Sequence, residues 1–413
     1  MARASLLAAA AAAAVSAAPN GLALTPPRGW DSWNLFHRNI SAALFTDTAD
    51  ALVALGLLAA GYNHVNVDGG WWAGVDTGVV LRNASGFVQE SPSVFPAGIK
   101  AVVDHVHSRG LLWGHYTDGG THACNGDAPM SEGYEAQDAA QFAFWGADML
   151  KIDACAVTTA DRQALMARWA ALLNATGRPV LLSNCRNACL TAPGTPPALG
   201  WQPWCAAVAN MWRTSGDIKA TWASMLANLD SLRGRGAVAG PGAWNDPDLL
   251  ELGIGEFAWA ADGSTAGANA AHLALWAVTS SPLIIGFDVR PAAAPPAALL
   301  ALVTNALALR VNAEYAGNAG DVLASAPDGG EVWGKPLRGG AGAAVLLNRN
   351  AGGAPLDVAV ALAAVPGLPR GAAACNVTDV WSGAPRGRVA AGGAFTATVP
   401  PRAAAFVLFD ACS

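Results

Sequence analysis

The stretch Met149-Leu150-Lys151-Ile152-Asp153 decides the fold. It is a short, mostly apolar run that predicts a β-strand, it follows a helix-like segment at 134–145, and it ends in a carboxylate. Residues two apart on a strand face the same side, so Lys151 and Asp153 point the same way. A charged pair at the end of an apolar strand indicates a site as well as a strand, with a buried ion pair in the core as the alternative.

The same strand-and-helix unit repeats along the chain from about residue 22 to about residue 315. Seven further strand candidates lie at 29–33, 65–68, 111–118, 180–184, 211–217, 238–246 and 283–288. Repeated βα units of this length predict a parallel sheet closed into a (β/α)8 barrel, also called a TIM barrel. The predicted fold class is therefore α/β, with a catalytic barrel over residues 22–315.

The pattern of the sequence changes after about residue 316. Glycine-rich turns then separate short alternating runs at 331–334, 343–348, 356–362, 377–381, 395–399 and 404–409. This pattern predicts a small C-terminal antiparallel β-sandwich over residues 316–413. It contains no set of residues that suggests catalysis.

Most of the predicted barrel strands end in a carboxylate. These acids are Asp68, Asp118, Asp153, Asp217, Asp246 with Asp248, and Asp288. The C-terminal ends of barrel strands share one face, and that face carries the active site. Any single aspartate could instead cap the helix that follows it, but so many acids on one face predict a functional site.

The N-terminal segment predicts export from the cell. One arginine, an apolar run at 6–15 and small residues before Pro19 make residues 1–18 a candidate signal peptide, with an alanine-rich tail as the alternative. Four Asn-x-Ser/Thr sequons fit a secretory route to the exterior, a vacuole or a lysosome, and they begin at Asn39, Asn83, Asn174 and Asn376. Seven cysteines allow disulfides there, and the odd number leaves at least one without an internal partner.

Composition narrows the range of partners. Only 13% of the residues are charged, the net charge is −6, and no run of lysine or arginine stands out, which argues against a nucleic-acid partner. The apolar run at 6–15 is too short to span a bilayer, and no later segment is long and apolar enough to do so. Some of the 16 tryptophans could stack on sugar rings. The oligomeric state stays open, a homodimer included.

Two carboxylates that flank a glycosidic bond are sufficient for its hydrolysis. In a retaining enzyme one attacks the anomeric carbon, while the other protonates the leaving oxygen and later activates water. Asp153 is the candidate nucleophile, because the cation of Lys151 favours its charged form. Asp217, which ends the stretch Trp212-Arg213-Thr214-Ser215-Gly216-Asp217, is the candidate acid/base. The alternative for Asp217 is an N-cap of a helix that starts near Ile218.

These motifs resemble the α-galactosidase (melibiase) group, glycoside hydrolase family 27. The resemblance covers nearly all of the chain after the N-terminal segment and is strongest from Leu24 to about Arg290. It rests on six stretches in the order of the family: Thr25–Asn34, Gly61–Asp68, His107–Leu111 with Tyr116–Asp118, Lys151–Cys155, Trp212–Ile218 and Gly240–Leu249.

The resemblance implies retaining hydrolysis of terminal α-D-galactosides on a carbohydrate substrate, with no metal and no organic cofactor. It implies that Asp153 is the nucleophile and Asp217 the acid/base. It assigns substrate binding to Trp33, Asp68, Tyr116, Lys151, Arg213 and Asp248. Arg186, which does not match the family, is a further candidate for substrate binding. It also implies a disulfide between Cys124 and Cys155 beside the pocket.

The sequence departs from the family beside the second strand. Gly69 stands where the family has a second aspartate, so a charged acceptor for a sugar hydroxyl is missing, and the fit of the C6 group is in question. A family disulfide that joins this motif to the first strand is also lost, with Gly70 and His37 at its expected positions.

The loop at 183–189 departs from the family as well. Arg186 and Cys189 match neither the α-galactosidases nor the α-N-acetylgalactosaminidases at the positions that screen C2 of the sugar. By analogy with the family Cys185 would pair with Cys205, and Cys189–Cys205 is the alternative. A Cys375–Cys412 pair would join strands of the sandwich.

Three functions remain open from the sequence. The first is α-galactosidase, and the second is α-N-acetylgalactosaminidase or β-L-arabinopyranosidase of the same family. β-L-Arabinopyranose is galactose without its C6 group, which suits the change at Gly69. The third is an inactive sugar-binding protein, and the intact Lys151-x-Asp153 and Arg213-x-x-x-Asp217 motifs argue against it.

Overall fold

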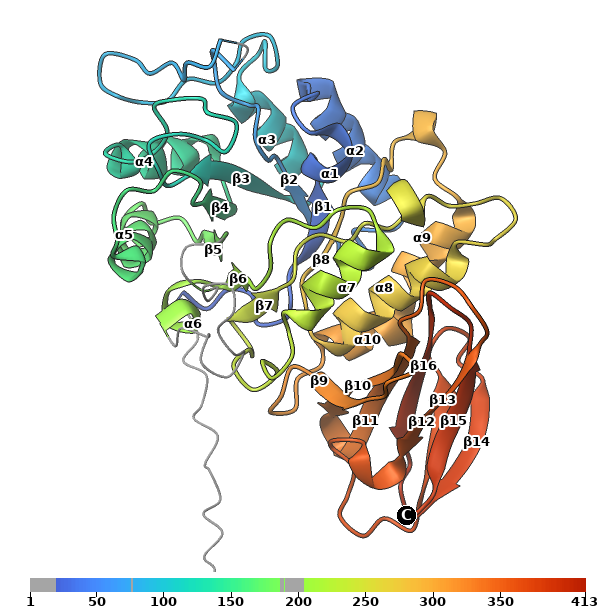
Figure 1. The fold of residues 1–413 in the computed structure, drawn as a ribbon. Helices are drawn as coiled ribbons and strands as arrows, with labels where there is room; N and C mark the ends of the chain where they lie inside the picture. Colours follow the sequence, from blue (N-terminus) through green and yellow to red (C-terminus); the bar gives the residue numbers. More distant parts are fainter. Residues whose placement is uncertain (1–19, 76, 186–188, 190–203) are drawn as a thin grey trace, which may run out of the picture.

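The computed structural model of the chain describes residues 20–75, 77–185, 189 and 204–413. A barrel of parallel strands lies beside a C-terminal antiparallel domain (Figure 1). The candidate signal peptide at 1–18 and the candidate binding residue Arg186 lie outside the described residues.

Eight short parallel strands form the barrel wall. They are β1 (Arg28–Asp31), β2 (His64–Asn66), β3 (Leu112–Asp118), β4 (Met149–Asp153), β5 (Leu181–Asn184), β6 (Met211–Arg213), β7 (Trp244–Asp246) and β8 (Leu283–Ile285). Their order in the sheet is β7-β6-β5-β4-β3-β2-β1-β8. Strands that neighbour one another in chain order, with β1 beside β8, are typical of a (β/α)8 barrel. The predicted fold class is confirmed.

The segment after β7 closes the barrel. The N–H of Leu250 donates to the carbonyl of Ile284 at 2.8 Å, and Leu250 pairs in parallel with Ile285. The turn between β7 and this bridge holds Asp248 at a φ of 86°. Such a left-handed conformation is uncommon for a residue with a side chain and is found most often at functional sites.

Alternation along β4 separates the core from the site. Leu150 and Ile152 are buried in the main hydrophobic core. Met149 packs instead with the first residues of the three following strands, Leu181, Met211 and Trp244. Because alternate residues of a strand share a face, Lys151 and Asp153 lie on the same side as Met149 but nearer the C-terminal end. The barrel interior is therefore apolar at one end and charged at the other.

Helices surround the barrel (Figure 1). They are α1 (Trp33–Phe36), α2 (Ala42–Ala54), α3 (Ile99–Ser108), α4 (Glu135–Trp145), α5 (Arg162–Ala175), α6 (Trp204–Val208), α7 (Trp222–Asp230), α8 (Ala266–Val278), α9 (Ala297–Val303) and α10 (Ala306–Ala313). Side-chain caps fix where several of them begin: Asp161 accepts from the N–H of Ala164, and Thr221 accepts from that of Ser224. None of the helices in the described part of the chain is long and apolar enough to cross a membrane.

The C-terminal domain has two antiparallel sheets. The larger has the order β14-β13-β16-β11-β10-β9, and the smaller pairs β12 with β15. The strands are β9 (Asp321–Ser325), β10 (Gly330–Leu337), β11 (Ala341–Asn348), β12 (Leu356–Ala361), β13 (Ala374–Asp379), β14 (Pro385–Ala390), β15 (Ala394–Val399) and β16 (Ala403–Asp410). Val358 and Phe395 of the small sheet share a core with Leu346 and Phe409 of the large one. The predicted sandwich is confirmed. The edge strands β9 and β14 were not predicted from the sequence.

The sandwich is fixed to the barrel by a shared core and by ion pairs. Helix α8 is buried along most of its length, because it packs on the barrel on one side and on β11 and β16 on the other. At the end of α7, Asp230 accepts from Arg349 at 2.7 Å, and Arg349 also bonds Glu331 of β10 at 2.9 Å.

Candidate active site

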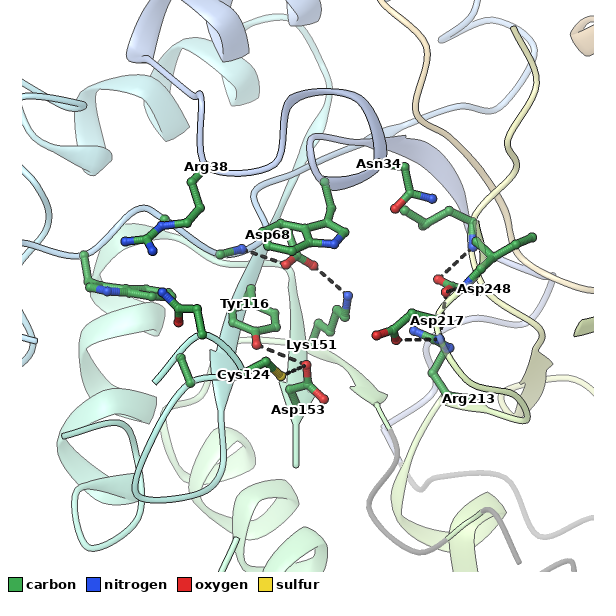
Figure 2. Close-up of a pocket in the computed structure, with 18 residues that line it drawn as sticks. Asn34, Arg38, Asp68, Tyr116, Cys124, Lys151, Asp153, Arg213, Asp217 and Asp248 are labelled. Atoms are coloured by element: carbon green, nitrogen blue, oxygen red, sulfur yellow. Dashed lines mark hydrogen bonds and ion pairs between the residues drawn. The ribbon is translucent and has the colours of Figure 1, made fainter. Parts of the chain in front are cut away.

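A cavity of about 220 Å³ opens at the C-terminal ends of the barrel strands (Figure 2). It gathers side chains from loops and strands that are far apart in the sequence. All the sequence-predicted catalytic and binding residues that the structure describes line it, namely Trp33, Asp68, Tyr116, Lys151, Asp153, Arg213, Asp217 and Asp248. Two of them have different positions and surroundings: Asp153 ends β4, and Asp217 lies in the loop after β6.

Asp153 is the last residue of β4 and is nine-tenths buried. The hydroxyl of Tyr116 donates to its Oδ2 at 3.1 Å, and the N–H of Ala154 donates to its Oδ1 at 2.9 Å. Burial, and then the charge of Asp153, raises the pKa of Tyr116, so this phenol stays protonated and remains a donor. Two donors on two oxygens fix the carboxylate in one orientation.

Lys151 lies on the same side of β4 as Asp153, but its ammonium group bonds Asp68. The distance from Nζ to Oδ2 of Asp68 is 2.6 Å, and Asp68 follows β2. Burial is the largest single influence and lowers the pKa of Lys151, but the surrounding negative groups, with Asp68 first and Asp31 and Asp153 after it, together raise this pKa above its usual range. The result is a fixed ion pair that offers both donors and acceptors to sugar hydroxyls.

Asp217 lies in the loop after β6, because that strand ends at Arg213 rather than at 217. Its Oδ1 accepts from Nη2 of Arg213 at 3.0 Å, and its side chain is 67% exposed. Helix α7 begins only at Trp222 and is capped by Thr221, so the alternative of Asp217 as a helix N-cap is wrong. The carboxyl group is at the rim, where it can exchange protons with solvent.

Asp248 holds the loop that carries Asp217. Its Oδ2 accepts from Arg213 at 2.7 Å and from the N–H of Ile218 at 2.8 Å. Burial is the largest single influence and lowers the pKa of Arg213, but the carboxylates around it, with Asp248 first and Asp246 and Asp217 after it, together raise this pKa. The guanidinium group therefore stays charged while it bridges Asp217 and Asp248.

Three of the predicted ring of acids do not line the cavity. Asp118 accepts from the N–H groups of Gly120 and Cys155, Asp246 accepts from that of Asp248, and Asp288 pairs with Arg290. Burial raises the pKa of both Asp118 and Asp246 to about 6. These three acids brace the loops that surround the cavity, which is a structural role of the kind that was left open for any single aspartate.

Gly69 leaves no open gap in the cavity wall. A Cβ atom at this position would lie 3.3 Å from Cζ3 of Trp33 and 3.6 Å from Cη2 of Trp72. An aspartate here would therefore press on the tryptophan rings. At this point the rings of Trp33 and Trp72 form the cavity wall, where an aspartate side chain would otherwise stand.

Arg38, and not His37, faces Gly70. A Cβ atom on Gly70 would lie 3.2 Å from Cα, Cβ and Cγ of Arg38, so the assignment of His37 to the lost disulfide was wrong. Four polar or aromatic residues that line the cavity were also missed from the sequence: Asn34, Arg38, Trp72 and Asn125. Asn34 and Arg38 could have been predicted from the sequence. Both follow the predicted binding residue Trp33 closely, in the segment after β1.

Three disulfides are present in the described residues. Cys124–Cys155 lies at the cavity, with Sγ of Cys124 3.3 Å from Oδ2 of Asp153. The second is Cys189–Cys205, which was the alternative pairing, and the third is Cys375–Cys412.

Asp118, Cys124, Asp153 and Cys155 together have the residue types of a metal site. Their two sulfurs are joined in the disulfide, so they are not the thiolates that bind metals.

Glu251 lies behind the cavity wall and accepts a hydrogen bond from Nδ2 of Asn34. It is 1% exposed, and burial, together with the charge of Asp248, raises the pKa of Glu251 to about 8. The folded protein then holds a proton that the unfolded chain releases above about pH 4.5. Because the folded state binds more protons in this window, stability falls as pH rises from about 4.5 to about 8.

We expect Glu251→Gln to remove this contribution. One group changes the free energy of unfolding by about 1.4 kcal/mol per pH unit inside its window. The variant should therefore lose less stability than the wild-type protein between pH 5 and pH 8, as measured by urea unfolding at several pH values. Asp104→Asn, at an exposed carboxylate of α3, is the control. Equal slopes for wild type and Glu251→Gln would mean that Glu251 is ionised in the fold.

The barrel, its appended sandwich and the carboxylates at its mouth define a barrel-type glycoside hydrolase. Residues 25–313 match the family model described as alpha galactosidase A, and residues 327–409 match the alpha galactosidase C-terminal beta sandwich domain. The chain belongs to the α-galactosidase family.

Individual relatives extend over most of the chain. The α-galactosidase of Cyamopsis tetragonoloba is 38% identical over 81% of this chain and 75% of its own length. The α-N-acetylgalactosaminidase of Gallus gallus is 34% identical over 92% of each chain. Among solved structures, the α-galactosidase of Saccharomyces cerevisiae has a TM-score of 0.83 and 26% identity, and covers 96% of this chain and 100% of its own.

Proposed function

We propose that the chain removes terminal, non-reducing α-D-galactose from oligosaccharides or glycoconjugates, with retention of configuration at the anomeric carbon. The observation that carries this proposal is the pair Asp153 and Asp217 in one cavity, the first oriented and buried, the second exposed at the rim. The two surroundings suit two roles, because a nucleophile must be held in place and an acid/base must exchange protons.

In the first half of the reaction Asp153 attacks C1 from the β face. The C1–O bond of the α-galactoside breaks as Asp217 gives its proton to the leaving oxygen, and a β-galactosyl ester of Asp153 forms. In the second half Asp217 takes a proton from water, the water oxygen bonds to C1, and the bond to Asp153 breaks. The product is α-galactose, and both carboxyl groups return to their starting states.

The remaining residues bind the sugar. The ion pair of Lys151 and Asp68 supplies charged hydrogen-bonding groups for hydroxyls, and such bonds are stronger than neutral ones. Trp33 offers an aromatic surface for the C–H face of the ring. Arg213 reaches the same space while it holds Asp217, so binding and proton transfer share one group.

Turnover of a panel of nitrophenyl glycosides tests the proposal. The purified protein is assayed with the α-galactoside, the α-N-acetylgalactosaminide and the β-L-arabinopyranoside, and we expect the α-galactoside to have the highest kcat/KM. Proton NMR during the reaction should show α-galactose as the first product. Turnover of none of the three would leave only a sugar-binding protein, and β-galactose as the first product would exclude the double displacement.

We also propose that the chain passes through the secretory pathway. The asparagines of all four sequons are exposed, and three disulfides suit an oxidising compartment. Protein from its natural source should lose mass when it is treated with a peptide N-glycosidase, and an unchanged mass would argue against this route.

A further inference from the structure

One end of the cavity has a different chemistry from the end that holds the catalytic pair. Figure 2 shows Arg38 on one side of Asp68, and Asp217 with Arg213 on the other. The bond that is cleaved must lie between Asp153 and Asp217. The half of the galactose ring opposite C1, made of C3, C4 and C5 with its exocyclic C6 group, therefore points toward the end that holds Arg38.

Among the described residues that line this end of the cavity, Asp68 is the one carboxylate. Gly69 brings no side chain, and the rings of Trp33 and Trp72 close the wall beside it. The nearby carboxylate of Asp68 is paired with Lys151 at 2.6 Å. The wall is therefore poor in acceptors for a hydroxyl that donates a hydrogen bond.

Arg38 is anchored through one nitrogen and keeps its other donors. Its Nη2 bonds the carbonyl of Val75 and Oδ2 of Asp127, the latter at 3.2 Å. Asp127 is 3% exposed and also accepts from Nε1 of Trp72 at 2.8 Å, so the anchor is rigid. The Nε and Nη1 atoms of Arg38 make no hydrogen bond to any described residue, and 36% of its side chain is exposed. A fixed cation with unused N–H groups is suited to an anionic oxygen.

We propose that this end of the cavity is a subsite for an anionic group on C6 of the galactose, and that Arg38 is the residue that determines this specificity. The ligand would be a 6-O-sulfate ester or the C6 carboxylate of a galacturonide, since both present oxygens that accept from N–H groups. This inference rests on the proposed function, because the sugar must enter with C1 between Asp153 and Asp217. An aspartate in the place of Gly69 would repel such a group, so Gly69 and Arg38 favour the same ligand.

Isothermal titration calorimetry with three simple sugars tests the proposal. Galactose, galactose 6-sulfate and galacturonate are titrated into the wild-type protein, and at least one of the two anionic sugars should bind roughly tenfold more tightly than galactose. The tighter of the two identifies the source of the anion. If galactose binds at least as tightly as each of the two anionic sugars, the inference is overturned. This outcome needs the wild-type protein alone and no variant.

Variants assign the effect to Arg38. Arg38→Gln should remove the advantage of the anionic sugar, and Arg38→Lys should keep part of it because the charge remains. Arg370→Gln makes the same change of charge at an exposed site of the C-terminal domain and should keep the full advantage. An advantage that survives in Arg38→Gln would overturn the role of Arg38. Turnover of nitrophenyl α-galactoside by the same preparations reports on the proposed function separately, since it does not depend on the anion.

Discussion

Replacement of Asp153 by glycine should lower kcat/KM for α-galactosides by roughly 10⁴-fold or more, because it removes the atom that attacks C1. The change deletes one carboxylate whose two oxygens are held by Tyr116 and by the N–H of Ala154. The rest of the cavity, including the pair of Lys151 and Asp68, should keep its form. Binding of galactose by calorimetry should therefore survive while turnover is lost.

Added azide should show whether the role lost in Asp153→Gly is that of the nucleophile. The space left by the carboxylate of Asp153 can admit a small anion, which would attack C1 from the same face. With 2,4-dinitrophenyl α-galactoside, whose leaving group needs no proton, Asp153→Gly and azide should yield β-galactosyl azide. Asp288→Asn is the control, since Asp288 pairs with Arg290 away from the cavity. Formation of the α-azide by Asp153→Gly would show that another group is the nucleophile.

The barrel could be predicted from the sequence because its signals are local. Each strand is a short apolar run, and alternation places Lys151 and Asp153 together on its inner side. The bounds of β4 agree with the sequence pattern to the residue. The edge strands β9 and β14 were missed because β9 has no fully buried residue and β14 has only one, so they lack the alternating apolar pattern that marks a strand.

The contacts that arrange the site are not local, and they could not be predicted in the same way. Lys151 was expected beside Asp153, yet its ammonium bonds Asp68 from another strand, because the sheet curls and brings separate strand ends together. The carboxylates that brace loops could not be separated from those that line the cavity, because both kinds follow strands. The position of Arg38 shortly after Trp33 could be seen in the sequence, but its contact with Gly70, a residue distant in the sequence, could not.

Replacement of Asp217 by alanine should have an effect that depends on the leaving group. Proton transfer by a positioned side chain contributes about 10²–10⁴-fold to a rate. An α-galactosyl oligosaccharide has a poor leaving group, so its hydrolysis should fall by about this factor. Formation of the glycosyl ester from 2,4-dinitrophenyl α-galactoside needs no proton and should be nearly as fast as in the wild type. Arg213 loses one of its two carboxylate partners but keeps Asp248, which should hold it in place.

The ester should then accumulate in Asp217→Ala, because no group remains to activate water. A burst of dinitrophenol followed by a slow steady rate is the expected time course. Azide needs no activation and should restore the steady rate, with α-galactosyl azide as the product, because it attacks the β-linked ester of Asp153 from the opposite face. Equal losses for both substrates, with no burst, would mean that Asp217 positions the cavity through Arg213 and does not transfer the proton. The opposite configurations of the two azides, β for Asp153→Gly and α for Asp217→Ala, would assign the two carboxylates independently of the family resemblance.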